Sequence, residues 1–362
     1  MSGDRTNGQP SGPPATRQYV QFIFYKANAS WRALSTDDRE AIKDEAVAAV
    51  EAFSSEMQVR AYSLVGVRGD ADFMFWHISD DLSPFQQAAT ALLSTRLGPY
   101  LSTPYAYLAL TRKSQYADKT EAGAAASRRL RLKPGTAKYL FVYPFVKTRA
   151  WYNLPQEERQ AMMDDHIRIG RKYPSVKLNT TYSFGIDDQE FVVAFETDEP
   201  GDFLDLVMEL RETKSSLYTV RDTPAFTCVA TTVRGALDAI GGAGARIERP
   251  DEAADGAWTR VCDAAELPAG ARRVVYFRAE QVALLNVDET VYAIEARCPH
   301  ANGPLVDGGV EGTALTCPSH GSRFDLARGC EVVQGPAVRP ARCYAVRVEG
   351  GGVFLAEAAA VR

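Results

Sequence analysis

Strand-like and helix-like patterns of apolar residues alternate along the N-terminal part of the chain and follow the same order twice. In each copy a run of β-forming residues leads to a charged amphipathic stretch, then to two strand-like runs, a second amphipathic stretch and a last strand-like run. The leading segments span 19–25, 37–51 and 62–77 in the first copy, and 139–146, 155–172 and 179–196 in the second. The order β-α-β-β-α-β is that of a ferredoxin-like unit, which predicts an α+β pseudo-dimer of two antiparallel sheets.

An internal repeat supports this prediction. When the chain is laid on itself at an offset of 118 to 120 residues, Trp31 coincides with Trp151 and Phe85 coincides with Phe203. The second copy differs from the first at one chemically important position, because His166 falls opposite Ala46. We therefore place a candidate site in the second copy.

The pattern changes beyond the repeats. Residues 235–257 are rich in Gly, Ala, Asp and Glu, which predicts a linker. Short alternating strands follow and predict an antiparallel β-sandwich or barrel, at 273–278, 281–286, 290–294 and 344–348. The expected organisation is therefore a disordered tail at 1–16, a first domain at 17–234, the linker at 235–257 and a second domain at 258–362.

Composition excludes several classes of protein. With 41 Lys and Arg against 46 Asp and Glu, and no long basic run, nucleic acid has little to bind. No apolar run approaches the roughly eighteen residues needed to span a membrane, and the Gly/Pro/Ser-rich N-terminus does not read as a leader, so we expect a cytoplasmic protein. Four cysteines are scattered without a framework spacing and are expected to be reduced: Cys228, Cys262, Cys330 and Cys343.

A thiol and an imidazole are paired twice between residues 298 and 320. Cys298-Pro-His300 is followed, after sixteen residues, by Cys317-Pro-Ser-His320. A four-cysteine zinc site or a zinc finger has a different spacing, and a structural zinc ribbon remains the alternative. Two Cys on one iron and two His on the other is the ligand set of a Rieske two-iron, two-sulfur cluster.

The sequence resembles the Rieske ferredoxin family from about Trp258 to the C-terminus. The likeness includes Gly-Pro-Leu after the first ligand pair, Gly-Ser-Arg-Phe-Asp after the second, and Gly-Pro beyond. Ser322 matches a hydroxyl that donates to the cluster in high-potential members, whereas Phe324 stands where those members have Tyr. The resemblance therefore implies a cluster with a potential in the lower part of the Rieske range.

His166 lies on an amphipathic segment and shares an apolar face with Met162 and Ile169. A lone His on such a face is more often a core residue than a ligand. The motifs around His166 favour a ligand here. The motifs Tyr-Pro-Phe-Val-Lys at 143–147, Trp-Tyr at 151–152, His at 166, Asp-Asp at 187–188 and Glu-Leu-Arg at 209–211 are similar to the chlorite dismutase and coproheme decarboxylase superfamily, which has a dimeric α/β barrel fold.

This resemblance implies a haem site with specific roles. His166 would be the proximal ligand of haem b or coproheme. Lys147 and Trp151 would line the haem site, and Arg211 would lie near the distal pocket and the propionates. Tyr143 matches the radical-forming residue of the decarboxylases, with a strand aromatic in the core as the alternative.

The sequence departs from the chlorite dismutases at one position of the distal pocket. Those enzymes carry an Arg on the strand after the ligand helix, where this chain has Leu178 or, counted without a gap from His166, Asn179. Neither side chain is a cation that could hold chlorite, so we reject chlorite dismutation. His77 follows Trp76 in a strand-like run and is expected to be structural.

Fusion of the two modules favours reductive chemistry, because a haem that reduces dioxygen needs single electrons and a Rieske cluster carries one. The leading interpretation is an oxygen-activating oxygenase or oxidase acting on a small molecule, with the cluster as electron donor and an external flavin reductase supplying it. The alternatives are a coproheme decarboxylase that the cluster feeds or regulates, and a haem carrier or redox sensor. The expected partners are a small-molecule substrate and dioxygen or peroxide. The haem family resemblance also implies a homo-oligomer.

Overall fold

The two repeats form the strands and helices that their patterns predict. We describe a computed structural model of the chain over residues 17–116, 130–242, 258–277 and 280–357. The first repeat comprises β1 (Tyr19–Ala27), α1 (Thr36–Glu51), β2 (Gln58–Ser63), β3 (Phe73–Ser79), α2 (Ser83–Ser94) and β4 (Leu101–Leu110). The second comprises β5 (Tyr139–Lys147), α4 (Arg149–Asn153), α5 (Gln156–Gly170), β6 (Lys177–Tyr182), β7 (Phe191–Thr197), α6 (Pro200–Arg211), β8 (Thr219–Arg221) and β9 (Phe226–Thr231). The predicted tail at 1–16 lies outside the described residues.

The two sheets of the predicted pseudo-dimer join into one. Within the described residues the strand order is β7-β6-β4-β1-β3-β2-β9-β5-β8, and β5 also pairs with β7, so that the sheet closes on itself as a barrel. Closure leaves no long unpaired edge on either half. The interior is filled by large buried side chains that alternate with outward-facing ones, including Phe22, Trp76 and Phe226. The predicted α+β barrel architecture is thus confirmed.

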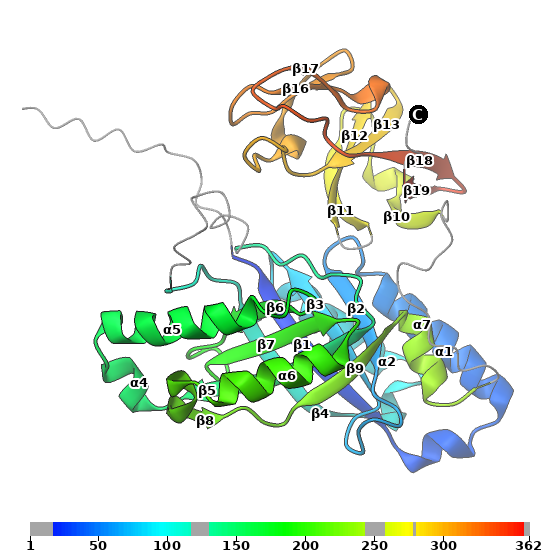
Figure 1. The fold of residues 1–362 in the computed structure, drawn as a ribbon. Helices are drawn as coiled ribbons and strands as arrows, with labels where there is room; N and C mark the ends of the chain where they lie inside the picture. Colours follow the sequence, from blue (N-terminus) through cyan, green and yellow to red (C-terminus); the bar gives the residue numbers. More distant parts are fainter. Residues whose placement is uncertain (1–16, 117–129, 243–257, 278–279, 358–362) are drawn as a thin grey trace, which may run out of the picture.

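The helices pack on the outer face of the barrel (Figure 1). Ser35 begins α1 by accepting a hydrogen bond from the Asp38 amide, and Asp37 and Asp38 place negative charge at the positive end of the helix. Helix α5 starts after Pro155 and carries Glu157 and Glu158 in its first turn. The space between the helices and the sheet differs between the two repeats.

In the first repeat that space is filled by helix α7 (Val233–Ala239). Helix α7 packs between α1 and strand β2, and Ala236 and Leu237 are completely buried there beside Ala46. The predicted linker therefore begins inside a packed helix, and the first domain extends to the buried Ile240. The rest of the linker, 243–257, lies outside the described residues.

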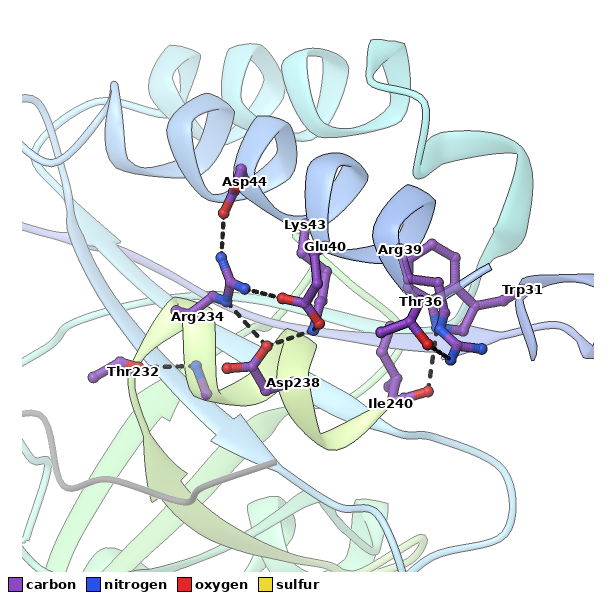
Figure 2. Close-up of polar contacts among 11 residues, drawn as sticks. Trp31, Thr36, Arg39, Glu40, Lys43, Asp44, Thr232, Arg234, Asp238 and Ile240 are labelled. Atoms are coloured by element: carbon purple, nitrogen blue, oxygen red, sulfur yellow. Dashed lines mark hydrogen bonds and ion pairs between the residues drawn. The ribbon is translucent and has the colours of Figure 1, made fainter. Parts of the chain in front are cut away.

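A buried lysine and its ion-pair partners join α7 to α1 (Figure 2). Lys43 Nζ has no exposed side-chain surface and donates to Asp238 Oδ1 at 2.6 Å and to Glu40 Oε1 at 2.7 Å. Arg234 pairs with Asp238, Glu40 and Asp44 from the other side. Since a buried ammonium ion is costly without partners, Asp238 compensates the charge that Lys43 carries into the interface.

The C-terminal domain is all-β, as predicted. Its six-stranded sheet has the order β10-β19-β18-β13-β12-β11, and a four-stranded sheet has the order β14-β15-β16-β17. The first contains β10 (Thr259–Asp263), β11 (Arg272–Phe277), β12 (Glu280–Val287), β13 (Thr290–Glu295), β18 (Cys343–Glu349) and β19 (Gly352–Glu357). The second contains β14 (Gly309–Glu311), β15 (Ala314–Thr316), β16 (Arg323–Asp325) and β17 (Glu331–Gln334).

One expectation about the cysteines is wrong. Cys330 and Cys343 form a disulfide, with their Cα atoms 5.7 Å apart, although thirteen positions of sequence separate them. Their spacing carries no signal because the bond joins the start of β17 to the start of β18, which only the folded domain brings together. Cys228 and Cys262 are free and buried, as expected. No helix of the described residues is long and apolar enough to cross a membrane.

Candidate active site

A cavity of about 2200 Å³ lies where the second repeat meets the C-terminal domain. Its walls come from α5, from the outer face of β5, β6 and β7, and from the loop that follows β13. A pocket for one small ligand measures roughly 300 to 1000 Å³, so this cavity can hold a large planar cofactor and a further molecule. The matching space in the first repeat is the one that α7 fills.

The sheet gives the cavity an aromatic wall. Alternate residues of β5 point in opposite directions, so Leu140 and Val142 enter the barrel core while Tyr143 and Phe145 face outward into the cavity. Phe191 and Phe195 of β7 extend the same wall. The opposite wall is helix α5, whose cavity-lining residues are Met163, His166 and Ile167. A flat apolar ring system would be covered on both faces by these walls.

His166 projects from α5 at the cavity. Burial, with a smaller contribution from the Lys147 cation, lowers the pKa of His166 to about 4, so its ring is neutral near pH 7. Its Nδ1 atom is buried and has no hydrogen-bond partner among the described residues. A neutral imidazole at the wall of this cavity is a suitable donor to a haem iron.

Lys147 and Trp151 form a cationic corner beside His166. The Lys147 ammonium lies 4.6 Å from the centroid of the buried Trp151 ring and donates to the Ser215 carbonyl oxygen at 2.7 Å. Burial lowers the pKa of Lys147 to about 8, which the Glu190 carboxylate partly opposes. Lys147 is therefore a positively charged group close to the candidate metal ligand.

Tyr143 lines the cavity, so the structure does not place it in the barrel core. Its ring stacks on Phe195 with 5.8 Å between centroids, and burial raises the pKa of its hydroxyl well above the usual range. Arg211 lies at the rim, mostly exposed, and pairs with Asp222 at 2.5 Å. A ligand carboxylate would have to compete with Asp222 for that guanidinium.

The structure distinguishes the two candidates for the distal position on β6. Both residues border the cavity, but Asn179 is buried and donates to Glu196 Oε1 at 2.8 Å, whereas Leu178 is 49% exposed. Aligning β2 with β6 end to end places Leu178 opposite Val59, which packs in the core that α7 completes. Leu178 is thus the more exposed of the two candidates at the cavity.

Sequence reasoning missed most of the basic residues at the cavity. Eight Lys or Arg and four Asp or Glu line it among the described residues. Those outside the predicted site are drawn from several strands and loops and are Arg112, Arg131, Lys133, Lys177, Arg297 and Arg339. This excess of positive charge suits a ligand that carries carboxylates, such as porphyrin propionates.

The four predicted cluster ligands lie on two adjacent loops of the C-terminal domain. Cys298 and His300 follow β13, and Cys317 and His320 lie between β15 and β16. Both thiols are buried, and the two imidazole rings lie 5.0 Å apart, nearly perpendicular. No three of the described His, Cys, Asp and Glu side chains converge as they would on a single ion. Paired thiols and paired imidazoles match a cluster with two irons.

Backbone contacts hold the loops at close range. The amides of Cys298 and Cys317 donate to the carbonyl oxygens of Gly303 and Ser322, each at 2.8 Å. A Cβ atom on Gly303 would lie 2.8 Å from Cys317 Sγ, so glycine is needed at this approach. Burial raises the pKa of the Cys298 thiol, and metal binding is what would hold it as a thiolate. The residues present fit the cluster.

The cavity joins the two candidate sites. His300, Asn302 and Ser319 from the cluster loops line the same cavity as His166 and Tyr143. This juxtaposition could not be predicted, because the loops and α5 are far apart in the chain. One space is therefore open to both sets of metal ligands.

Two sequence profiles match the chain. The family described as chlorite dismutase matches residues 39–231, and the Rieske [2Fe-2S] domain matches residues 257–345. The first match spans more than half of the chain and lies within the barrel domain. The second contains all four predicted cluster ligands.

Individual proteins show the same similarity. Coproheme decarboxylase from Mycolicibacterium smegmatis is 34% identical over 216 residues, which are 59% of this chain and 91% of that protein. Coproheme decarboxylase from Oceanobacillus iheyensis is 31% identical over 198 residues, which are 50% of this chain and 78% of that protein. The structure of chlorite dismutase from Candidatus Nitrospira defluvii in complex with imidazole is 28% identical, with a TM-score of 0.56 over 61% of this chain and 94% of that one.

Proposed function

This chain belongs to the chlorite dismutase family and continues into a Rieske [2Fe-2S] domain, and from that premise we propose a haem-dependent oxidoreductase that activates dioxygen on a small molecule with electrons from its own cluster. The two matches make the chain an oxidoreductase-type enzyme that binds haem or coproheme and a two-iron, two-sulfur cluster. Residues 17–240 would form the haem domain and 258–357 the Rieske domain.

The shared cavity carries this proposal. A cluster that served only a structural role could sit anywhere on the C-terminal domain, but His300 and its loop line the cavity that His166 also lines. An electron that left the cluster through His300 would enter the cavity in which His166 would hold the haem. His166 would hold the haem iron, and Lys177 and Arg211 are among the cations that would hold its carboxylates. When bound, the haem would supply redox chemistry with dioxygen or peroxide.

The surroundings of His166 favour a reduced haem. Metal-ligating His residues usually donate their second ring N–H to a carboxylate or carbonyl, which raises the basicity of the ligand. His166 Nδ1 has no such partner among the described residues, and the Lys147 cation acts on the ring. A less basic ligand beside a positive charge stabilises ferrous iron relative to ferric iron. This effect suits an enzyme whose haem is reduced by an electron donor.

The substrate and partners belong to the same proposal. Leu178 offers no charge to an anion, so chlorite is not the proposed substrate, and the aromatic wall suits a small apolar molecule. We assign the supply of electrons to a flavin reductase in the cytoplasm, and we expect a homo-oligomer.

A second candidate is coproheme decarboxylase. Two relatives carry that name, Tyr143 faces the cavity, and the excess of basic residues suits a porphyrin with four propionates. In that case the cluster would feed or regulate the decarboxylation. A haem carrier or redox sensor is the third candidate, favoured only if no substrate turns over.

The bound porphyrin distinguishes these candidates. Porphyrin is extracted from the purified full chain and identified by mass, and the chain is then reduced anaerobically and exposed to air with flavin reductase. Haem b that survives many turnovers supports the proposed oxygenase. Conversion of bound coproheme into haem b during turnover would overturn the oxygenase proposal in favour of the decarboxylase. The Cys317→Ala variant, which loses a cluster ligand, should lose reductase-driven turnover but retain reaction with peroxide.

A further inference from the structure

Polar side chains bridge the two domains beside the cluster. Arg131 of the haem domain donates through Nη2 to Asp80 Oδ2 at 2.8 Å and to Gln281 Oε1 of the Rieske domain at 3.0 Å. Gln281 Nε2 in turn donates to the Tyr276 hydroxyl at 3.0 Å and approaches Asp80 Oδ2 at 3.4 Å. One guanidinium therefore connects a carboxylate of one domain to an amide of the other.

The bridge continues to the first cluster loop. Gln281 lies on β12, and its backbone carbonyl oxygen accepts a hydrogen bond from the Ala296 amide at 2.9 Å, two residues before Cys298. The next residue, Arg297, is bridged to Pro304 across the base of the same loop. Through Gln281 the haem domain is thus linked by two hydrogen bonds in series to the strand end that carries the first cluster ligands.

Arg131 also borders the haem cavity. Asp80, Arg131 and Gln281 line that cavity together with His300 and Asn302. The contact therefore borders the cavity that the cluster loops share with His166. Side-chain bridges of one charged donor with two acceptors fix relative orientation better than isolated surface ion pairs.

We propose that Asp80, Arg131 and Gln281 form a docking clasp that holds the cluster of each chain at the haem cavity of the same chain. This inference rests on the proposed function, and it makes electron transfer a reaction within one subunit. One electron leaves the reduced cluster, which becomes oxidised, and ferric haem in the same chain becomes ferrous. A flavin reductase or dithionite then reduces the oxidised cluster again.

The clasp is tested with full-length Arg131→Gln loaded with both cofactors. The cluster is reduced rapidly and the reduction of the haem is followed by its absorption. Loss of a hydrogen-bonding guanidinium should lower the docked population and the transfer rate about tenfold, while both cofactor spectra stay unchanged. Arg131→Lys should recover most of the rate. Arg96→Gln, which removes an exposed ion pair with Glu45 far from the domain contact, is the matched control and should transfer at the wild-type rate.

A mixing experiment tests whether transfer stays within one chain. His166→Ala lacks the haem ligand and Cys317→Ala lacks a cluster ligand, so each alone should be inactive with reductase and dioxygen. A co-assembled mixture should remain inactive if each cluster serves its own haem, whereas recovery of turnover overturns the proposal. Small-angle scattering of the apoprotein gives an independent measure, because Arg131→Gln should enlarge the radius of gyration.

The outcomes separate this inference from the proposed function. Absence of haem reduction in the wild-type chain would overturn the proposed function itself. Haem reduction in the wild-type chain, together with unchanged rate and scattering in Arg131→Gln, would overturn the clasp alone.

Discussion

Ser322 is the side chain that acts most directly on the cluster ligands. Its Oγ accepts a hydrogen bond from the Ala337 amide at 3.0 Å, which leaves its hydroxyl proton to be donated toward Cys298. A hydrogen bond to a ligand sulfur stabilises the reduced, more negative cluster. The residue is completely buried, so water cannot replace the bond if it is lost.

We predict that Ser322→Ala lowers the midpoint potential of the cluster by about 60 mV, the one-electron equivalent of about 1.4 kcal/mol. Phe324→Tyr, which adds a hydroxyl at the second donor position, should raise the potential. Redox titration followed by electron paramagnetic resonance measures both. A wild-type midpoint near the upper end of the Rieske range of roughly −150 to +300 mV, or no response to either change, would contradict these roles.

His77 makes folding sensitive to acid. It is buried in β3, its Nδ1 lies 3.1 Å from Gln21 Oε1, and burial lowers its pKa to about 3. The unfolded chain binds a proton near pH 6.5, which the folded chain does not do until far lower pH. The unfolded state therefore holds more protons between these values, and stability falls as the pH falls through this window.

The His77→Gln variant should remove this sensitivity while its amide can still donate to Gln21. We predict that wild-type protein loses about 1.4 kcal/mol of unfolding free energy more than the variant for each pH unit below about 6.5. Urea unfolding at several pH values, followed by tryptophan fluorescence, measures the difference. Parallel pH profiles for the two proteins would show that His77 has the same pKa in the folded and unfolded states, which would contradict this role.

At the scale of elements, α7 makes the two repeats different, because it packs where the second repeat has an open cavity. It fills the space between α1 and β2, whereas the space between α5 and β6 stays open as the cavity. The first repeat has Ala46 where the second has His166, and Ala46 is completely buried in the core that α7 completes. A cofactor in the first repeat would have to displace the helix.

We predict that Asp238→Ala destabilises the haem domain by about 3 kcal/mol, because buried Lys43 then keeps only Glu40 as a direct partner. The double variant Lys43→Met with Asp238→Leu removes both charges and should be close to wild type in stability. Glu45→Ala, which breaks an exposed ion pair, is the control and should cost less than about 1 kcal/mol. Thermal unfolding gives the comparison, and equal losses in Asp238→Ala and the double variant would argue against a charge effect.

For the whole molecule, the assignment of two separate metal sites fixes the iron content. Each wild-type chain should hold one haem and one two-iron cluster. We predict that His166→Ala loses the haem and keeps the cluster spectrum, and that Cys317→Ala keeps the haem and loses the cluster. Iron, acid-labile sulfide and porphyrin are measured on the same samples, with His77→Gln as a control that keeps all three. Loss of both cofactors in either variant would contradict two independent sites.

The sequence by itself determined the features that depend on local spacing. The ferredoxin-like repeats follow from periodicity and from matches such as Trp31 with Trp151, because strands and helices impose fixed periods on their buried faces. The Cys-Pro-His and Cys-Pro-Ser-His motifs are equally local, since short loops must present their ligands at defined offsets. The choice of His166 as the candidate haem ligand rested on the difference between the two copies, because Ala46 stands at the matching position of the first.

Only the tertiary structure decided the features that join distant parts of the chain. Pairing of β5 with β7 closed the barrel, α7 occupied the first repeat, and strand β6 left Leu178 exposed at the cavity while Asn179 was buried against Glu196. The Cys330–Cys343 disulfide and the contact of Arg131 with Gln281 have the same origin. Each depends on which surfaces pack together, and packing is set by the complementarity of whole faces, which no short stretch of sequence contains.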